Sequence, residues 1–355
     1  MSLSLEEKKQ YQRHIVLSEI GEQGQLKLKN AKILVVGAGG LGCPILQYLV
    51  GAGIGVVGIV DGDVVSKSNL QRQILYTVND IGKHKVDVAI EKLSQLNPHV
   101  KLNPHKFFLN NDNVIPLFKE YDIIVDGTDN FPTRYLVNDA CVIVGKPLVF
   151  GSIFKFQGQV SVFNYKGSGT YRCLYPEPPK PGSVPNCSDI GVLGVLPGIV
   201  GTLQANEVLK LVLGLGNLMT NKLLYFDALS MEQQILEFSK NETLKINALE
   251  ADYHFFCGET LPSDMKIISS EKFLEEKEKF TILDVRTEME FEDFNIGGFH
   301  IPLDELEERM GELPNHKPMV VCCATGIRSA KAVELLLEYH FPDYVYSLKN
   351  GLDVI

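Results

Sequence analysis

The sequence predicts an α/β protein in which a doubly wound parallel sheet is followed by a second, smaller α/β domain. Short β-branched runs at residues 31–37 (AKILVVG) and 55–60 (GVVGIV) enclose a segment with helical spacing of apolar residues at 43–52. Residues 121–125 and 147–150 also have the character of short buried strands. Such an alternation of strands and helices is typical of parallel, doubly wound sheets.

The later part of the chain predicts where the domains divide. Residues 159–164 (QVSVFN) alternate as a half-exposed strand does, and the proline-rich residues 165–190 predict a long irregular loop. Turn-forming residues without periodicity predict a linker over 246–263. We therefore expect one domain over residues 1–245 and another over 264–355, where a new β-then-α pattern begins.

The composition excludes several classes of protein. Of the 355 residues, 45% are hydrophobic and 22% are charged, as in globular proteins, and no apolar run is long enough to span a membrane. The N-terminus lacks the pattern of a signal peptide, so we expect a cytoplasmic protein. Its seven cysteines then indicate thiols, ligands or nucleophiles rather than disulfides. The net charge of −10 disfavours a nucleic-acid partner and favours a protein or a small molecule.

A glycine motif follows the first strand. Gly37, Gly39 and Gly42 form G-x-G-x-x-G between this strand and a helix, where phosphate oxygens can approach backbone N–H groups. Asp61 ends the next strand, where a carboxylate can accept hydrogen bonds from ribose hydroxyls. Taken alone, the motif favours a nicotinamide dinucleotide.

The residues after Asp61 favour a triphosphate instead. Asn69, Arg72 and Gln73 share one short stretch, and Lys85 follows a little later. Guanidinium and ammonium groups neutralise phosphate oxygens, and arginine does so with bidentate geometry. Hydride transfer needs no such clamp, whereas attack on an α-phosphate does.

Two carboxylates end a later strand. Asp126 and Asp129 lie in "IIVDGTDN", and a carboxylate at the carboxyl end of a strand can hold Mg²⁺ on bound phosphates. The alternative for each charged residue taken singly is an ordinary solvated side chain near a turn.

Several motifs together carry a resemblance to a known family. "YQRHI", "GAGGLG", "SNLQRQ", "GKHKV", "DGTDN" and "PLVFGSIFKFQGQVSVF" resemble the adenylating enzymes of the MoeB/ThiF group, relatives of ubiquitin-activating E1 enzymes, over roughly residues 5–245. The resemblance implies ATP-dependent adenylation of the C-terminal Gly-Gly carboxylate of a ubiquitin-like sulfur carrier protein of the MoaD, ThiS or Urm1 type. It also implies a homodimer, because Arg13 matches an arginine that reaches across the dimer interface. The positions that match ATP-contacting residues of the family are Gly40, Asp61, Ser68, Asn69, Leu70, Gln71, Arg72, Lys85, Asp129 and Asn130.

The last 90 residues carry a second resemblance. "TILDVRTEMEFEDFNIGGFHIPLDEL", "KPMVVCCATGIRSAKAVELLLEYHF" and "VYSLKNG" resemble a single rhodanese domain. Four residues separate Cys323 from Arg328 in a loop before a helix, where inward N–H groups favour a thiolate or persulfide. Cysteine phosphatases have one more residue in this loop, so the shorter loop favours sulfur chemistry over phosphate chemistry. Cys322 is expected in the core, and an inert buried thiol is the alternative for Cys323.

A third cysteine belongs to the proline-rich loop. Cys187 falls where the family has an acyl-accepting or resolving cysteine, and an exposed loop thiol without a role is the alternative.

The sequence departs from the family at its zinc site. Many relatives carry two C-x-x-C pairs, whereas here the matching positions are Thr170 with Cys173, and His254 with Cys257. Three ligands remain where structural Zn²⁺ prefers four, so we expect loss of the metal more than its retention.

The two resemblances together imply a fused enzyme of the MoeZ, Uba4 and MOCS3 type. One domain would activate a carboxylate with ATP and Mg²⁺, and the other would pass on persulfide sulfur to give a thiocarboxylate for molybdopterin, thiamin or tRNA thiolation. The expected sulfur source is a protein persulfide donor such as a cysteine desulfurase. The alternative is a non-catalytic nucleotide-binding module that regulates or docks partners.

Overall fold

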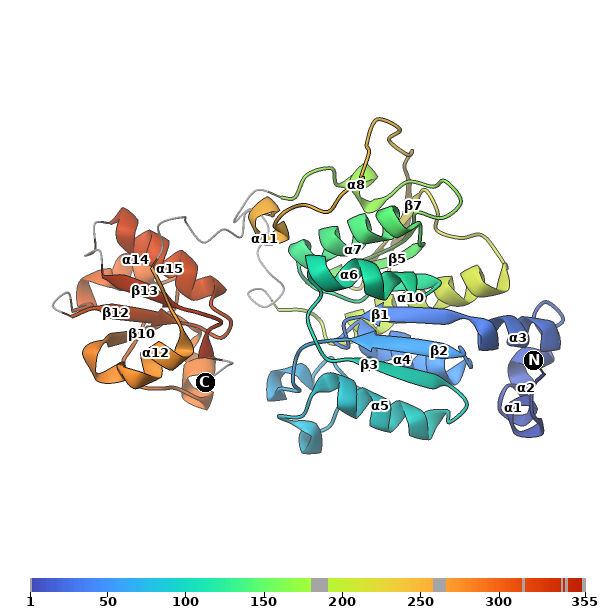
Figure 1. The fold of residues 1–355 in the computed structure, drawn as a ribbon, viewed down its shortest axis with the longest axis horizontal. Coiled ribbons are helices and arrows are strands. Elements are labelled where there is room, and N and C mark those ends of the chain that lie inside the picture. Colours follow the sequence, from blue (N-terminus) through green and yellow to red (C-terminus); the bar gives the residue numbers. More distant parts are fainter. Residues whose placement is uncertain are drawn as a thin grey trace. The chain divides into compact units, whose positions relative to one another are not determined.

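The computed structural model describes residues 2–179, 191–257, 266–314, 317–339, 341 and 344–352. The chain forms two compact units, residues 1–258 and 259–355, each with its own sheet (Figure 1). Within the described residues, no helix combines the length and the apolar character needed to cross a membrane.

The first unit is built on an eight-stranded sheet with the order β3-β2-β1-β4-β5-β6-β7-β8. The strands from β3 to β5 in this order pair in parallel, and those from β5 to β8 pair antiparallel. The strands are β1 (Lys32–Val36), β2 (Val56–Val60), β3 (Lys101–His105), β4 (Ile123–Asp126), β5 (Leu148–Phe154), β6 (Gln157–Phe163), β7 (Lys222–Asp227) and β8 (Gln233–Glu237).

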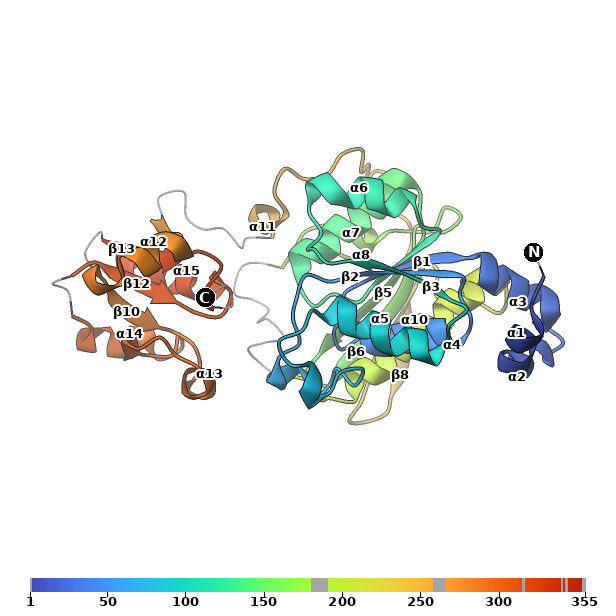
Figure 2. The same ribbon diagram turned by 60° about the horizontal axis from the view of Figure 1, so that its bottom comes forward.

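Helices cover both faces of this sheet, as Figure 2 shows. Helices α3 (Gly21–Asn30), α4 (Gly42–Gly51), α5 (Lys85–Leu96) and α10 (Leu196–Leu213) pack on one face. Helices α6 (Asn111–Lys119), α7 (Phe131–Val144), α8 (Tyr171–Leu174) and α11 (Tyr253–Phe256) pack on the other. The short helices α1 (Leu5–Gln10) and α2 (Gln12–Ile15) precede α3.

Strand β1 shows how the sequence specifies this layering. Its apolar residues alternate between the two cores, with Ile33 and Val35 in one and Leu34 and Val36 in the other. A strand that is buried on both faces therefore reads as a continuous apolar run. The predicted doubly wound α/β fold is confirmed.

Two details of the sheet differ from the prediction. The sheet is mixed rather than parallel throughout, because β6, β7 and β8 run antiparallel to their neighbours. The strand expected to be half-exposed corresponds to β6, and Val160, Ser161, Val162 and Phe163 are all buried in it. Its polar position can be buried because the Ser161 hydroxyl lies within hydrogen-bond distance of the backbone carbonyls of Met219, before β7, and of Lys222, the first residue of β7.

The first unit also extends further along the chain than the sequence suggested. The expected linker began at residue 246, but the first unit runs to residue 258. Tyr253 and Cys257 are buried in the same core as α6 and α7. Their short segment has little periodicity, and its attachment depends on contacts with residues far away in the sequence.

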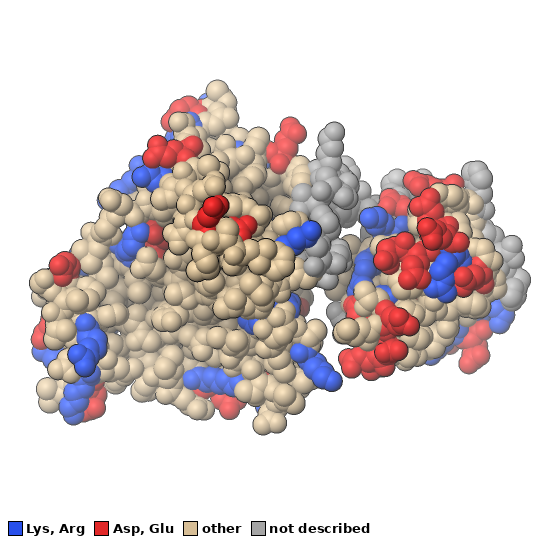
Figure 3. All heavy atoms as spheres, turned by 180° about the vertical axis from the view of Figure 1, so that it is seen from behind, with Lys and Arg blue, Asp and Glu red and all other residues tan. Residues whose placement is uncertain are grey.

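The second unit has a five-stranded parallel sheet with the order β11-β10-β12-β13-β9. Its strands are β9 (Ile267–Ile268), β10 (Thr281–Asp284), β11 (Phe299–His300), β12 (Met319–Cys322) and β13 (Val345–Leu348). Its helices include α12 (Ser270–Glu275), α13 (Glu288–Asp293), α14 (Leu306–Arg309) and α15 (Ile327–Glu338). Figure 3 shows many acidic side chains on one face of this unit, and scattered charges of both signs on the visible face of the first.

Candidate functional site

The predicted nucleotide residues meet at one edge of the first sheet. In the register of the parallel strands, Val36 of β1 pairs with Val60 of β2 and with Asp126 of β4. The loops that follow these three strands therefore leave the sheet side by side. This edge is the usual ligand site of an open α/β sheet.

The loop after β1 requires glycine at specific positions. Gly37 has φ +92°, and a Cβ there would lie 2.8 Å from the carbonyl oxygen of Gly127. A Cβ on Gly42 would lie 2.0 Å from the carbonyl oxygen of Gly37, so α4 can begin this close to the strand only with glycine. Around Gly39, the nearest side-chain atom to such a Cβ is Nε2 of Gln73 at 3.6 Å. The loop thus leaves the N-terminus of α4 accessible to an anion.

Asp61 is tied to this loop. Its Oδ2 accepts a hydrogen bond from the Ala38 N–H at 2.8 Å, and its Oδ1 accepts one from the Asp63 N–H at 2.8 Å. Burial raises the pKa of Asp61, and the nearby charge of Lys85 opposes that rise. Lys85 is itself buried and forms an ion pair with Asp63 at 2.7 Å. Lys85 therefore lies beside the Asp61 carboxylate, as the sequence predicted for one ligand site.

The segment after β2 lies over the glycine loop. Arg72 donates a hydrogen bond to the Ser68 carbonyl at 3.2 Å, and its Cγ is 3.6 Å from the position of a Cβ on Gly40. Asn69 accepts a hydrogen bond from the Ser66 N–H at 3.1 Å. Gln73 is buried beside Gly39, and its Oε1 lacks a partner among the described residues.

The two middle residues of this segment have different surroundings. Leu70 packs against the core on the α4 face. Gln71 lies beside Gly194, where a Cβ would be 2.4 Å from its Oε1. Neither contact involves the glycine loop. Leu70 attaches the segment to the core, and Gln71 contacts the residues that precede α10.

The two aspartates after β4 have different surroundings. Asp126 is completely buried, and its Oδ1 accepts hydrogen bonds from the N–H and hydroxyl of Thr128 at 2.9 and 2.6 Å. Asp129 is exposed and accepts no hydrogen bond from the described residues. Asn130 caps α7 by accepting from the Thr133 N–H at 2.9 Å. Asp129 is therefore the carboxylate that a cation in solution can reach, whereas Asp126 belongs to the core.

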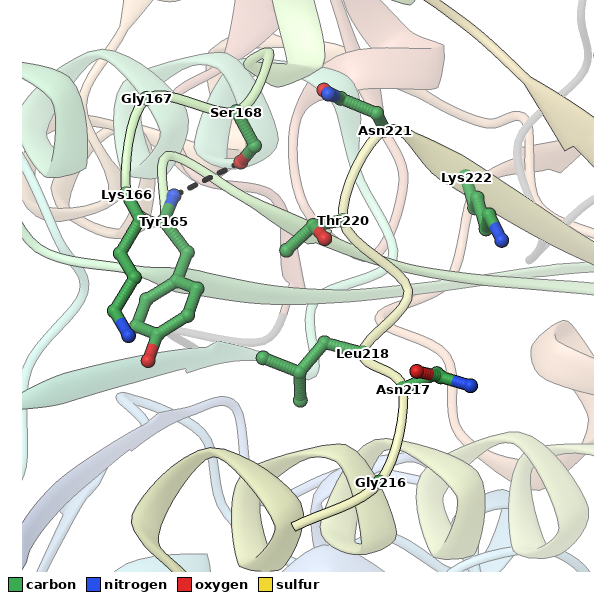
Figure 4. A pocket seen from close by; sticks show the side chains of 10 residues that line it. All are labelled: Tyr165, Lys166, Gly167, Ser168, Gly216, Asn217, Leu218, Thr220, Asn221 and Lys222. Carbon is green, nitrogen blue, oxygen red and sulfur yellow. Dashed lines mark hydrogen bonds between the residues drawn. The ribbon is translucent and has the colours of Figure 1, made fainter. Parts of the chain in front are cut away.

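A pocket of about 470 Å³ opens beside Asp129. Its walls are largely aromatic, with Phe150 from β5, Tyr171 from α8 and Tyr225 from β7. A second hollow, with a similar volume of about 490 Å³, lies between residues 165–168 and 216–222 (Figure 4). That hollow lies after the end of β6. Because Phe163 at this end pairs with Leu148, the first residue of β5, the hollow lies at the edge opposite the carboxyl ends of the parallel strands. The aromatic pocket is the one that shares an edge with the nucleotide motifs.

The structure places two predicted residues elsewhere. Arg13 is exposed on α2, which precedes the amino end of β1, far from the loops at the carboxyl edge (Figure 1). The structure of one chain therefore does not bring Arg13 to the other nucleotide residues. Cys187 lies outside the described residues.

The second unit places Cys323 directly after β12, at the start of the loop to α15. Its sulfur accepts hydrogen bonds from the N–H groups of Gly326 and Ser329 at 3.1 and 3.3 Å. The Ser329 hydroxyl, 3.7 Å from this sulfur, contacts the Ser347 hydroxyl at 2.9 Å. Cys323 is fully buried, and Cys322 is buried in the core as expected. The inward N–H groups suit an anionic sulfur.

Arg328 joins this loop to α13. Its two terminal nitrogens donate to the carboxylate of Glu290 at 2.7 and 2.6 Å. Burial raises the pKa of Glu290, but the hydrogen bonds from Arg328 and Thr287 outweigh it and hold the pKa at about 2. The sequence analysis missed Glu290, although T-x-x-E at Thr287 is a capping-box signal.

We expect Glu290→Gln to destabilise the second unit at neutral pH. The ordinary glutamate pKa is 4.5, so the ion pair stabilises the folded state fully above that pH and loses its effect as the pH falls towards 2. Thermal unfolding midpoints of variant and wild type should therefore differ at pH 7 and converge below pH 4.5. Glu288→Gln, an exposed change on the same helix, is the control. A gap that stays constant with pH would contradict this assignment.

The four positions that match the zinc site of the family lie in or beside α8 and α11. The described residues contain no group of three or more His, Cys, Asp or Glu side chains that could hold a metal ion. The Cys173 sulfur instead accepts hydrogen bonds from the N–H groups of Thr170 and Asn241 at 3.3 and 3.4 Å. Cys257 is buried in the apolar core, and His254 lies on α11 without completing a ligand set.

A polar cluster joins the segments that carry these residues. Asp139 of α7 is fully buried and accepts hydrogen bonds from Arg172 of α8 at 2.8 and 2.6 Å. It also accepts one from the Tyr253 hydroxyl of α11 at 2.7 Å. The Arg172 guanidinium lies 4.5 Å from the ring centroid of Phe256. This cluster of hydrogen bonds connects α7, α8 and α11.

We expect Asp139→Asn to lower the stability of the first unit by about 3 kcal/mol, because it leaves the buried Arg172 with only the partly exposed Glu250 carboxylate, at 3.0 Å, as a countercharge. Denaturant unfolding measures the change, and excess chelator should not alter the wild-type midpoint. Asp87→Asn, which breaks an exposed ion pair with Lys106, should cost at most about 1 kcal/mol. A chelator-sensitive wild-type midpoint would contradict a metal-free junction.

Comparison with known proteins identifies a family for each unit. Residues 11–246 match the ThiF family, and residues 269–355 match the rhodanese-like domain. A probable adenylyltransferase/sulfurtransferase MoeZ from Mycobacterium tuberculosis is 41% identical over 99% of this chain and 93% of that protein. An adenylyltransferase and sulfurtransferase MOCS3 from Drosophila grimshawi is 39% identical over 99% of this chain and 84% of that protein.

Two further matches concern the first unit. The sulfur carrier protein adenylyltransferase of Thermus thermophilus is 47% identical over 73% of this chain and 99% of that protein. The crystal structure of Escherichia coli MccB with ATP is 22% identical with a TM-score of 0.59, over 67% of this chain and 73% of that one, which shows a shared fold. The chain therefore belongs to the ThiF family, in the group that joins a ThiF adenylyltransferase domain to a rhodanese-like sulfurtransferase domain.

Proposed function

We propose that this protein adenylates the C-terminal Gly-Gly carboxylate of a ubiquitin-like sulfur carrier and then converts it to a thiocarboxylate. The observation that carries the proposal is the meeting of the glycine loop, Asp61 and the exposed Asp129 beside an aromatic pocket. The relative from Thermus thermophilus, whose name describes adenylation of a sulfur carrier protein, supports the substrate class.

ATP fits the edge of the sheet in one orientation. Its phosphates would lie at the N-terminus of α4 with Arg72 and Lys85, and its ribose hydroxyls would donate to Asp61. Phe108 follows β3 and is 67% exposed, and its ring lies 2.6 Å from the position of a Cβ on Gly62. We assign this ring, which the sequence analysis missed, as the surface on which adenine stacks.

Mg²⁺ suits the same edge, because the Asp129 carboxylate is exposed and accepts no hydrogen bond from the described part of the chain. When bound there, the ion would neutralise charge on the phosphates of ATP. Arg72 and Lys85 contribute to the same neutralisation, so that one anion can approach another.

The chemistry of the first step follows from this placement. A carboxylate oxygen of the carrier attacks the α-phosphorus of ATP, the bond to the bridging oxygen breaks, and pyrophosphate leaves. The carboxyl carbon is then activated, because AMP is a far better leaving group than an oxide ion. The aromatic pocket beside Asp129 holds the tail that delivers the carboxylate.

Cys323 carries the sulfur for the second step. A protein persulfide donor, such as a cysteine desulfurase, transfers its outer sulfur to the Cys323 thiolate and regains its own thiolate. The outer sulfur of the Cys323 persulfide attacks the carboxyl carbon, and AMP leaves, which gives an acyl disulfide between carrier and enzyme. A thiolate that attacks the inner sulfur releases the thiocarboxylate and leaves a disulfide with Cys323. Cys187 remains our candidate for this thiolate.

The position of Arg13 leads us to propose a homodimer in which it completes the site of the partner. Arg13→Ala and Arg72→Ala homodimers should each be inactive. When the two variants are mixed after mild denaturation, half of the dimers that form should contain one subunit of each kind, and each of these has one intact site of two. The mixture should therefore recover about a quarter of wild-type activity. Pyrophosphate exchange measures the recovery. Absence of any recovery would place both arginines in one site.

Carrier-dependent ATP–pyrophosphate exchange tests the proposed function. The full-length protein should exchange labelled pyrophosphate into ATP only when a carrier of the MoaD or ThiS type ending in Gly-Gly is present. A carrier that lacks its last two residues is the control. ATP binding without exchange for all Gly-Gly carriers would favour a regulatory nucleotide-binding module instead.

A further inference from the structure

The aromatic pocket contains a buried arginine that neither the nucleotide motifs nor the sulfur chemistry uses. Arg134 of α7 is 7% exposed and lines the same pocket as Asp129. Its guanidinium lies 5.4 Å from the ring centroid of Phe131 and 5.3 Å from that of Phe150. Aromatic rings at these distances stabilise a guanidinium through cation–π interactions and shield it from water.

Arg134 is held by groups behind the pocket. Burial raises the pKa of Asp126, and the positive charge of Arg134 is the next largest influence and lowers it. Arg134 also forms a hydrogen bond with the Tyr171 hydroxyl. The hydrogen bond with Tyr171 and the electrostatic interaction with Asp126 therefore tie the guanidinium to the buried part of the first unit.

The charges in the pocket are distributed unevenly. Among its described lining residues, Asp129 and Glu177 are acidic, and Arg134 is the basic residue. Glu177 is exposed, whereas Arg134 is buried among aromatic rings where electrostatic attraction is weakly screened. Of these three charged residues, Arg134 is therefore the one that attracts an anionic group in the pocket, and its attraction is the least screened by water.

We propose that Arg134 binds the terminal carboxylate of the Gly-Gly tail and so selects a free chain end for adenylation. This inference rests on the proposed function and adds a specificity-determining residue to it. The guanidinium fork fixes the plane of a carboxylate, and a hydrogen bond to one oxygen leaves the other available to the α-phosphorus. The flat aromatic walls can pack against a main chain that lacks side chains, as a Gly-Gly end does.

The test compares two forms of one carrier. The carrier that supports the strongest pyrophosphate exchange is prepared with a free C-terminal carboxylate and as a C-terminal carboxamide, and binding of both to the full-length protein is measured by calorimetry. A hydrogen bond to a charged group corresponds to about a 10- to 100-fold preference, so wild type should bind the carboxylate that much more tightly. Arg134→Gln should bind both forms alike, and Arg134→Lys should keep an intermediate preference.

The control and the measurement of ATP affinity separate specificity from general damage. Glu177→Gln changes a charge in the same pocket and should keep the wild-type preference for the carboxylate. The KM for ATP should change less than twofold in Arg134→Lys, because the residue does not touch the nucleotide. Arg134→Gln protein that still prefers the carboxylate as wild type does would overturn the inference. Wild-type protein that neither binds nor activates any carrier would instead overturn the proposed function.

Discussion

Cys323→Ser protein should form the acyl-adenylate at the wild-type rate but produce no thiocarboxylate. The substitution removes the one atom that can carry persulfide sulfur in the loop, while the nucleotide residues belong to a different compact unit. Pyrophosphate exchange measures the first step, and the intact mass of the carrier after one turnover measures the second. Thiocarboxylate formation is expected to fall below detection because oxygen cannot replace the transferred sulfur.

Cys322→Ser is the matched control, since it changes the neighbouring cysteine in the core and leaves the loop intact. It should retain sulfur transfer, with unfolding midpoints used to correct for any loss of folded protein. Sulfur transfer by Cys323→Ser with a protein persulfide donor would show that the second unit is not the carrier of sulfur. Loss of transfer in both variants would point to folding rather than chemistry.

Asp129→Ala should reduce adenylate formation by about 100-fold or more, which is the usual cost of losing one group that stabilises charge in a transition state. Asp129 is the exposed carboxylate at the end of β4, whereas Asp126 is buried and bonded to Thr128. Because the Asp129 side chain is bonded to no described residue, its removal should leave the fold unchanged. Carrier-dependent pyrophosphate exchange at saturating ATP measures the effect.

Asp112→Ala, an exposed aspartate in the first turn of α6, is the control and should exchange at the wild-type rate. The Asp129→Ala variant should unfold at the same denaturant concentration as wild type. Exchange by Asp129→Ala at the wild-type rate would remove this carboxylate from the reaction. Equal losses in both variants would show a general electrostatic effect of the acidic side chains.

The sequence was sufficient to predict that the candidate nucleotide residues share one edge of the sheet, because each part of this edge is local. Each strand and the polar residue that ends it are adjacent in the chain, as with β2 and Asp61, and parallel strands bring their carboxyl ends together. The same reasoning predicted the loop at Cys323. Glycine positions could be predicted for the same reason, since a turn is a property of a few neighbouring residues.

The remaining site residues depend on contacts that no local pattern reveals. Asp139 and Tyr253 are 114 residues apart, and Arg328 and Glu290 are 38 apart, yet each pair is in direct contact. For this reason the sequence did not reveal that residues 246–258 pack with the first unit. Arg134 and Phe108 were missed because an arginine or phenylalanine in a helix or loop has no distinctive spacing, and only the folded chain shows what it faces.

The burial of Cys323 has a consequence for how the protein survives in the presence of oxidants. Its thiol has no exposed surface, and the N–H groups of Gly326 and Ser329 surround the sulfur. Peroxides and electrophiles in solution therefore meet a shielded atom in the unloaded enzyme. The same shielding applies to a persulfide donor, so the loop that begins at Cys323 must open before sulfur can be transferred to it.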